Sequence, residues 1–176
     1  MNIQKSEVTK IIITGVENLD PVAVYLEDHG NASGKIIITC YGASWTHYWS
    51  HMGEGNTLID FFCSCDEHYI AKKLAPGIET SITNYSALID HAKRDVFTER
   101  RMGEISKEKA RELFNLIESF GNDGEYLFND RDYMYEIFGD EYWYGLPTEP
   151  NHEYQYICRI INTVKDALKT DLAVAA

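Results

Sequence analysis

Cysteine and histidine residues that could bind a metal ion are concentrated in the run CSCDEH, residues 63–68. Thiolate and imidazole groups are ligands that suit zinc. Residues 57–75 have helical periodicity, however, and residues two positions apart on a helix are separated by about 200° around its axis. Cys63 and Cys65 would then face different directions, and Cys65 belongs to the apolar face of the helix. We therefore interpret these thiols as structural, and we predict no metal site and no cofactor.

A second set of reactive side chains lies just before this helix. His47 and His51, with Cys40 nearby in the sequence, are residue types that form nucleophile and base pairs in enzymes. Such a pair needs an orienting third group and an oxyanion site, and the sequence marks neither. An enzyme is therefore the alternative hypothesis: a small hydrolase or transferase using His47, His51 or Cys65 in a pocket beside Trp45 and Trp49. It predicts a deep pocket at the junction between strand and helix.

The strongest deviation from ordinary composition is the charge of residues 118–154. This stretch contains ten acids and one base, Arg131, so it carries −9 of the chain's net charge of −12. Tyrosines and Trp143 are interleaved with the acids. Acids alone are typical of a solvated face, whereas acids mixed with aromatic residues are typical of an interface with a basic partner, and both interpretations are open. The ten acids are Glu118, Asp123, Glu125, Asp130, Asp132, Glu136, Asp140, Glu141, Glu149 and Glu153.

A local basic patch precedes the acidic residues in the chain. It could pair with the acids of the same chain, or with those of another copy in a self-assembling structural protein. The patch consists of Lys93, Arg94, Arg100, Arg101, Lys107, Lys109 and Arg111.

Length and charge limit the class of protein. A chain of 176 residues suits one domain with a single hydrophobic core. The net charge argues against nucleic acid or an anionic membrane as a direct partner, because those sites need a basic surface. No run reaches the roughly 18 apolar residues of a membrane span, and the first ten residues do not resemble a signal peptide. We therefore expect a cytoplasmic protein with reduced cysteines.

Residues rich in β-branched side chains indicate strands in the first 50 residues. We expect strands over Val8–Val16, Val22–Leu26 and Lys35–Tyr41, joined by short turns. Short links favour antiparallel neighbours, since parallel strands need a crossover of about a dozen residues or more. Residues 42–44 are either a bulge or the turn into a fourth strand, and periodicity does not choose between these.

Apolar residues at helical spacing indicate helices in the rest of the chain. The expected helices cover residues 57–75, 84–101, 106–121 and 150–169. Phe114 is expected to point inward, and Pro150 to occupy the first position of the last helix. Residues 121–150 are expected to be irregular, apart from a short helix at 130–138. This order predicts an α+β fold in one domain, residues 1–176, with an antiparallel sheet of three to four strands at about 7–50 and helices, at 57–170, packed on one face.

The stretch YGASWTHYWSHMG followed by FFCSCDEHYIAKKL resembles a segment found in small uncharacterised phage and prophage proteins. The resemblance covers residues 35–74. It implies a protein of a mobile element, and such small acidic proteins often bind and inhibit host nucleic-acid or defence machinery, in some cases by imitating the charge of DNA.

The leading hypothesis is a non-enzymatic acidic binding protein that docks on a basic host protein and inhibits it. A homo-oligomer is compatible with this hypothesis, whereas direct contacts with nucleic acid or membrane are not expected. The expected partner-binding residues are Asp130, Asp132, Tyr133, Glu136, Asp140, Glu141, Tyr142, Trp143 and Tyr144.

Overall fold

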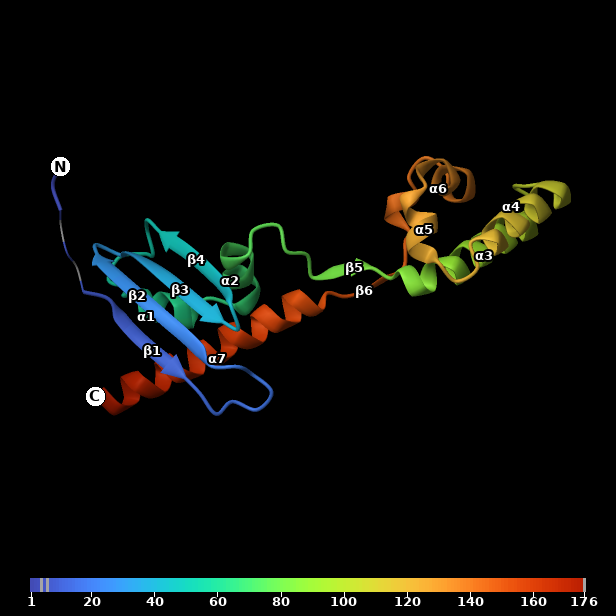
Figure 1. The fold of residues 1–176 in the computed structure, drawn as a ribbon. Coiled ribbons are helices and arrows are strands. Elements are labelled where there is room, and N and C mark those ends of the chain that lie inside the picture. Colours follow the sequence, from blue (N-terminus) through green and yellow to red (C-terminus); the bar gives the residue numbers. More distant parts are fainter. Residues whose placement is uncertain (4, 6, 176) are drawn as a thin grey trace. The chain divides into compact units, whose positions relative to one another are not determined.

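A computed structural model describes residues 1–3, 5 and 7–175. Four antiparallel strands form the N-terminal sheet, in the same order across the sheet as along the chain (Figure 1). They are β1 (Thr9–Ile13), β2 (Val22–Gly30), β3 (Ser33–Cys40) and β4 (Ala43–Trp49). The predicted α+β class and the N-terminal antiparallel sheet are confirmed.

Two tight turns connect the last three strands. Asn31 and Ala32, between β2 and β3, have φ angles of 51° and 54°, and Tyr41 and Gly42, between β3 and β4, have 45° and 80°. Positive φ at both central residues is characteristic of the two-residue turns whose twist matches that of antiparallel strands. Gly42 therefore belongs to the turn into a fourth strand, and not to a bulge in the third.

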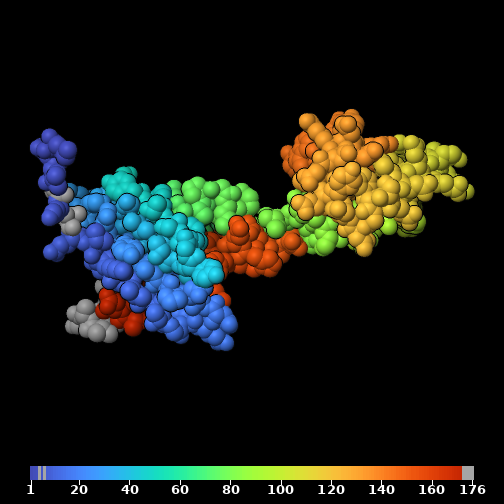
Figure 2. Space-filling view, in the orientation of Figure 1, coloured from blue at the N-terminus to red at the C-terminus, as the bar shows by residue number. Residues whose placement is uncertain are grey.

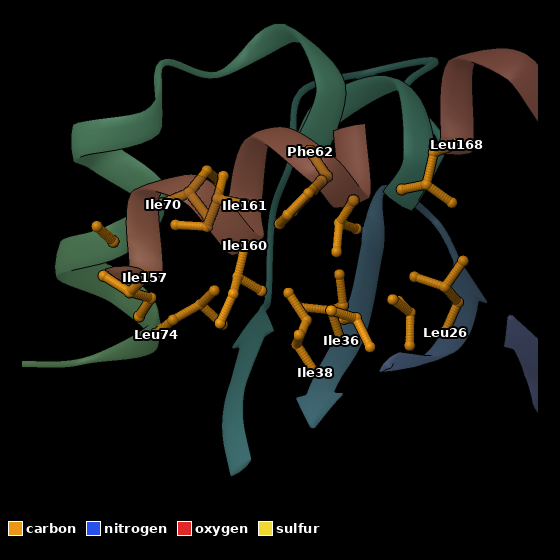
Figure 3. Close-up of a cluster of buried hydrophobic side chains, with 14 of the residues drawn as sticks. Leu26, Ile36, Ile38, Phe62, Ile70, Leu74, Ile157, Ile160, Ile161 and Leu168 are labelled. Carbon is orange, nitrogen blue, oxygen red and sulfur yellow. The ribbon is translucent and has the colours of Figure 1, made fainter. Parts of the chain in front are cut away.

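The first hydrophobic core lies on one face of this sheet. Alternate side chains of β2 and β3 point into it, as the period of a strand requires. Three helices cover this face: α1 (Leu58–Ser64), α2 (Glu67–Leu74) and α7 (His152–Ala175). Phe62, Ile70 and Ile161 come from these helices and are fully buried (Figure 3). Each side chain of this size contributes about 1.5–3 kcal/mol when it leaves water.

The single helix predicted over residues 57–75 is wrong, because the chain forms two helices there. α1 ends at Ser64, and Cys65 and Asp66 are extended, with ψ angles of 152° and 161°. The Asp66 side chain accepts a hydrogen bond from Tyr69 N at 2.8 Å, which caps α2 and favours the break. Cys65 still packs against the first core, but it does so from outside a helix.

The chain divides into two compact units: residues 1–80 with 152–176, and residues 81–151. The last helix therefore belongs with the sheet, although all of residues 81–151 lie between them in the sequence. We call these unit 1 and unit 2. The organisation of the whole chain as one folding domain stays a prediction.

Unit 2 is helical and has its own hydrophobic core. Its long helices are α3 (Tyr85–Met102) and α4 (Lys107–Ser119), which form an antiparallel pair. Asn84 and Ser106 cap their N-termini, close to the predicted boundaries. Gly103, with φ of 82°, ends α3 in the left-handed conformation common at helix C-termini. The buried core residues include Leu88, Ile89, Ala92, Val96, Leu113, Ile117, Leu127, Met134 and Ile137.

The expectation that residues 121–150 are mostly irregular is wrong. They form α5 (Gly124–Asn129), the predicted short helix α6 (Arg131–Phe138), the 3-10 turn η1 (Tyr142–Tyr144) and β6 (Thr148–Pro150). β6 pairs antiparallel with β5 (Ser81–Thr83). Pro150 therefore ends a strand, and α7 begins two residues later, at His152.

Candidate docking surface

One of the predicted partner-binding acids, Asp130, caps the N-terminus of a helix in unit 2. Asp130 directly precedes α6, and its side chain accepts a hydrogen bond from Tyr133 N at 3.3 Å. Asp123 does the same for α5, accepting from Tyr126 N at 2.9 Å. A side-chain oxygen in this position satisfies a backbone N–H that the helix itself leaves unpaired. Asp130 therefore stabilises the start of α6, whereas Asp132, two residues later, is exposed.

Two other acids are paired within unit 2. Glu136 accepts a hydrogen bond from Lys109 at 2.8 Å, and this contact raises the pKa of Lys109. The hydroxyl of Tyr135 donates to Asp140, and this hydrogen bond raises the pKa of Tyr135. The Lys109–Glu136 pair joins the basic patch to the acids of the same chain, so intrachain pairing accounts for part of the charge pattern.

The aromatic residues divide into buried and exposed sets. Tyr133 is half-buried and meets Phe120 edge-on, with ring centroids 5.4 Å apart. Tyr142 packs partly against the second core. By contrast Trp143 is 56% exposed and Tyr144 is 79% exposed. The predicted anchors Trp143 and Tyr144 are therefore accessible, and Tyr133 and Tyr142 mainly hold the unit together.

The accessible residues define the candidate docking surface: Asp132, Asp140, Glu141, Trp143 and Tyr144. All come from α6 and from the turn that follows it, whose residues appear orange in Figure 2. The three rings of η1 contact one another in sequence, with centroids 5.2 Å and 5.9 Å apart, which holds Trp143 in place. A hollow of about 310 Å³ lies at the corner between α5 and α6, lined by Tyr126, Asp130 and Asp132 among others.

Residues 118–154 do not belong to one unit. Glu153 and Tyr154 lie on α7, in unit 1. There the Tyr154 hydroxyl lies 2.9 Å from His68 Nδ1, and burial raises the pKa of Tyr154 to about 12. The acidic stretch of unit 2 therefore ends at Glu149.

The residues of the alternative enzyme site lie in unit 1. Trp49 is buried, and its Nε1 donates to the Tyr69 hydroxyl at 3.2 Å. His47 packs edge-on against Trp49, with centroids 4.7 Å apart, and Trp45, His47 and Trp49 all point to the core face of the sheet. Burial, followed by the charge of Lys73, lowers the pKa of His47, so the ring is neutral near neutral pH.

A hollow of about 470 Å³ is present near the junction, but it does not collect the proposed catalytic residues. His51 lines it, whereas His47 and Cys65 do not. Two of its other polar groups bind backbone: Asp28 accepts from Leu58 N at 3.1 Å, and Asn56 donates to Met52 O at 2.8 Å.

The thiols near this junction are not activated. Burial raises the pKa of both Cys63 and Cys65, which keeps them protonated at neutral pH, whereas a nucleophilic cysteine needs a lowered pKa. Among the described residues, no group of three or more His, Cys, Asp or Glu side chains is arranged to hold a metal ion.

A family model described as a phage family matches residues 1–170. The chain belongs to this phage family. The resemblance seen in residues 35–74 is thereby confirmed, and it extends over nearly the whole chain. No curated protein and no solved structure matches the chain. Within the described part of the phage protein, none of the helices is both long and apolar enough to cross a membrane.

Two aromatic side chains of unit 2, Phe97 and Phe114, are exposed, which was not predicted from the sequence. Phe114 was expected to point inward from α4, but it is 36% exposed, because the inward positions of that helix are filled by Leu113 and Ile117. Phe97 on α3 is 67% exposed. The sequence did indicate the exposure of Phe97, because this residue directly follows Val96 and so lies outside the apolar stripe of its helix.

Proposed function

We propose that the phage protein is a non-enzymatic binding protein whose candidate docking surface engages a basic host protein that normally binds nucleic acid. The observation that supports this most directly is the exposure of Trp143 and Tyr144 on a short turn that follows Asp140 and Glu141. Large aromatic side chains exposed together are unfavourable in water, and they are the residue types that dominate binding energy in protein interfaces.

The two kinds of side chain have different roles in this proposal. Trp143 and Tyr144 supply contact area, and their rings lose little conformational freedom on binding, because the contacts within η1 already orient them. Asp132 and Glu141 supply negative charge that steers the protein toward a basic surface. Carboxylates at these positions would occupy the places where the partner otherwise binds phosphate groups, which inhibits it by imitation of nucleic-acid charge.

The structure also separates residues suited to testing this proposal from residues that are not. Asp130 caps a helix, and Glu136 pairs with Lys109, so substitutions there change the fold of unit 2 as well as its charge. Asp132, Glu141 and Trp143 are exposed, and substitutions there leave those contacts intact.

The test is capture from host lysate with the full chain as bait, followed by titration of the purified captured protein. Trp143→Ala is expected to weaken binding by about 2 kcal/mol, roughly 30-fold in Kd, as for a central anchor residue. Asp132→Lys with Glu141→Lys is expected to slow association and to remove most of its salt dependence.

The matched control is Glu54→Lys with Asp171→Lys, which makes the same change in charge at exposed residues of unit 1. If this control weakens binding as much as the unit 2 pair does, net charge rather than the docking surface is responsible, and the proposal is wrong. Unchanged affinity for Trp143→Ala also contradicts it.

A further inference from the structure

The outer side of the α3–α4 pair carries an apolar groove with a basic rim. Val96 and Phe97 from α3, with Ala110 and Phe114 from α4, line a hollow of about 260 Å³. Arg100 from α3, and Arg111 and Asn115 from α4, also line the hollow. The groove therefore offers aromatic surface between two cationic side chains.

The groove is unfilled within its own unit. Its lining comes from α3 and α4 alone, and Phe97 is mostly exposed. Lys93 Nζ lies 5.7 Å from the centroid of the Phe114 ring, a cation–π contact that adds positive charge beside the groove. Residues 93–111 contain seven bases and four acids, so this segment has a net charge of +3 in a chain whose total is −12.

We infer that this groove receives the turn at residues 140–144 of a second copy of the chain. The turn has the complementary properties: two acids, Asp140 and Glu141, adjacent to two exposed rings, Trp143 and Tyr144. A hollow of this volume admits one large ring, and the arginines of the rim then lie beside the carboxylates that precede it. The turn does not fill the groove of its own unit, since both of its outer rings are exposed there.

Each copy presents both a groove and a turn, so association is either reciprocal or sequential. Two copies that exchange turns form a closed dimer with two identical contacts, whereas one-way contacts produce longer chains. Both arrangements use the same pair of surfaces, and both make association dependent on protein concentration and on salt.

This inference needs no host protein. The groove plays no part in the proposed function, whereas the turn at residues 140–144 belongs to the candidate docking surface. It also implies competition, because a turn held in the groove of a second copy is unavailable to a host partner. Failure of the two proposals is distinguishable, because self-association is measured on the purified chain alone.

The experiment is sedimentation velocity of the full chain over about a hundredfold range of concentration. The wild-type chain is expected to associate at low salt, and Arg100→Glu with Arg111→Glu is expected to weaken association by about 10- to 100-fold. Asp140→Lys with Glu141→Lys is expected to do the same. Arg94→Glu with Arg101→Glu is the matched control, because it makes the same change in charge on α3 outside the groove lining.

A mixture of the two double variants provides the decisive measurement. Neither variant associates well alone, but in the mixture the acidic turn of the groove variant meets the basic groove of the turn variant, and association is restored. Circular dichroism and thermal unfolding of each variant verify that unit 2 is folded. A wild-type chain that sediments as a monomer throughout overturns the inference. So does association that survives both variants, which places the contact elsewhere.

Discussion

Gly124 is the position where a single added methyl group should disturb unit 2 most. It begins α5 against α3, and a Cβ atom there would lie 2.0 Å from the carbonyl oxygen of Tyr85 and 3.3 Å from Cβ of Leu88. The nearer atom belongs to the backbone of a helix, so it cannot rotate away, and α5 must move instead. Overpacking of this kind costs about 1–3 kcal/mol, and a backbone contact this short belongs at the upper end.

We therefore expect Gly124→Ala to lower the free energy of unfolding of unit 2 by about 2–3 kcal/mol. The gain in helix propensity from Ala is at most about 1 kcal/mol and offsets only part of this. Urea unfolding followed by circular dichroism measures the loss, and amide hydrogen exchange locates it in α5 and α6.

Gly145→Ala is the matched control. Gly145 has a φ angle of −102°, and a Cβ atom there meets nothing within 4 Å, so the substitution should be neutral or slightly stabilising. The reasoning is refuted if Gly124→Ala unfolds at the same urea concentration as Gly145→Ala.

Two further predictions concern stability. Asp130→Ala removes the cap of α6 and should cost about 1 kcal/mol in urea unfolding, while the exposed Asp132→Ala should change it by less than about 0.5 kcal/mol. His47 has a folded-state pKa below its ordinary value of 6.5, so the unfolded chain binds more protons in this range and stability falls as pH decreases through about 6.5. His47→Asn should reduce that fall between about pH 7 and 5, and an unchanged pH profile would contradict it.

The elements with strong local patterns could be predicted from the sequence. β-branched runs located the strands, and apolar spacing with Asn84 or Ser106 as caps located α3 and α4 within a few residues. These features are predictable because neighbouring residues determine them. The exposure of Trp143 and Tyr144 could also be predicted, since acids surround them in the sequence.

The features that the sequence did not reveal depend on competition between alternative local structures, or on contacts between residues that are far apart in the sequence. The α1–α2 break occurs because Asp66 caps a new helix inside a stretch whose apolar period is continuous. The β5–β6 pair joins two three-residue strands more than 60 residues apart, and neither has a recognisable pattern alone. Tyr142 and Trp143 are adjacent aromatic residues in the same stretch of sequence. Only the packing of the second core decides that Tyr142 is half-buried and Trp143 is exposed.

The β5–β6 pair has a consequence for how the protein can change over time. Thr83 pairs with Thr148, so the chain leaves for α3 and returns from η1 at two adjacent points. Unit 2 is therefore an insertion between α2 and α7, closed at its base by a short ribbon. Such an insertion can lengthen, shorten or exchange its helices without altering the side chains that fill the first core. A phage protein built in this way can change its inserted unit while it keeps its sheet.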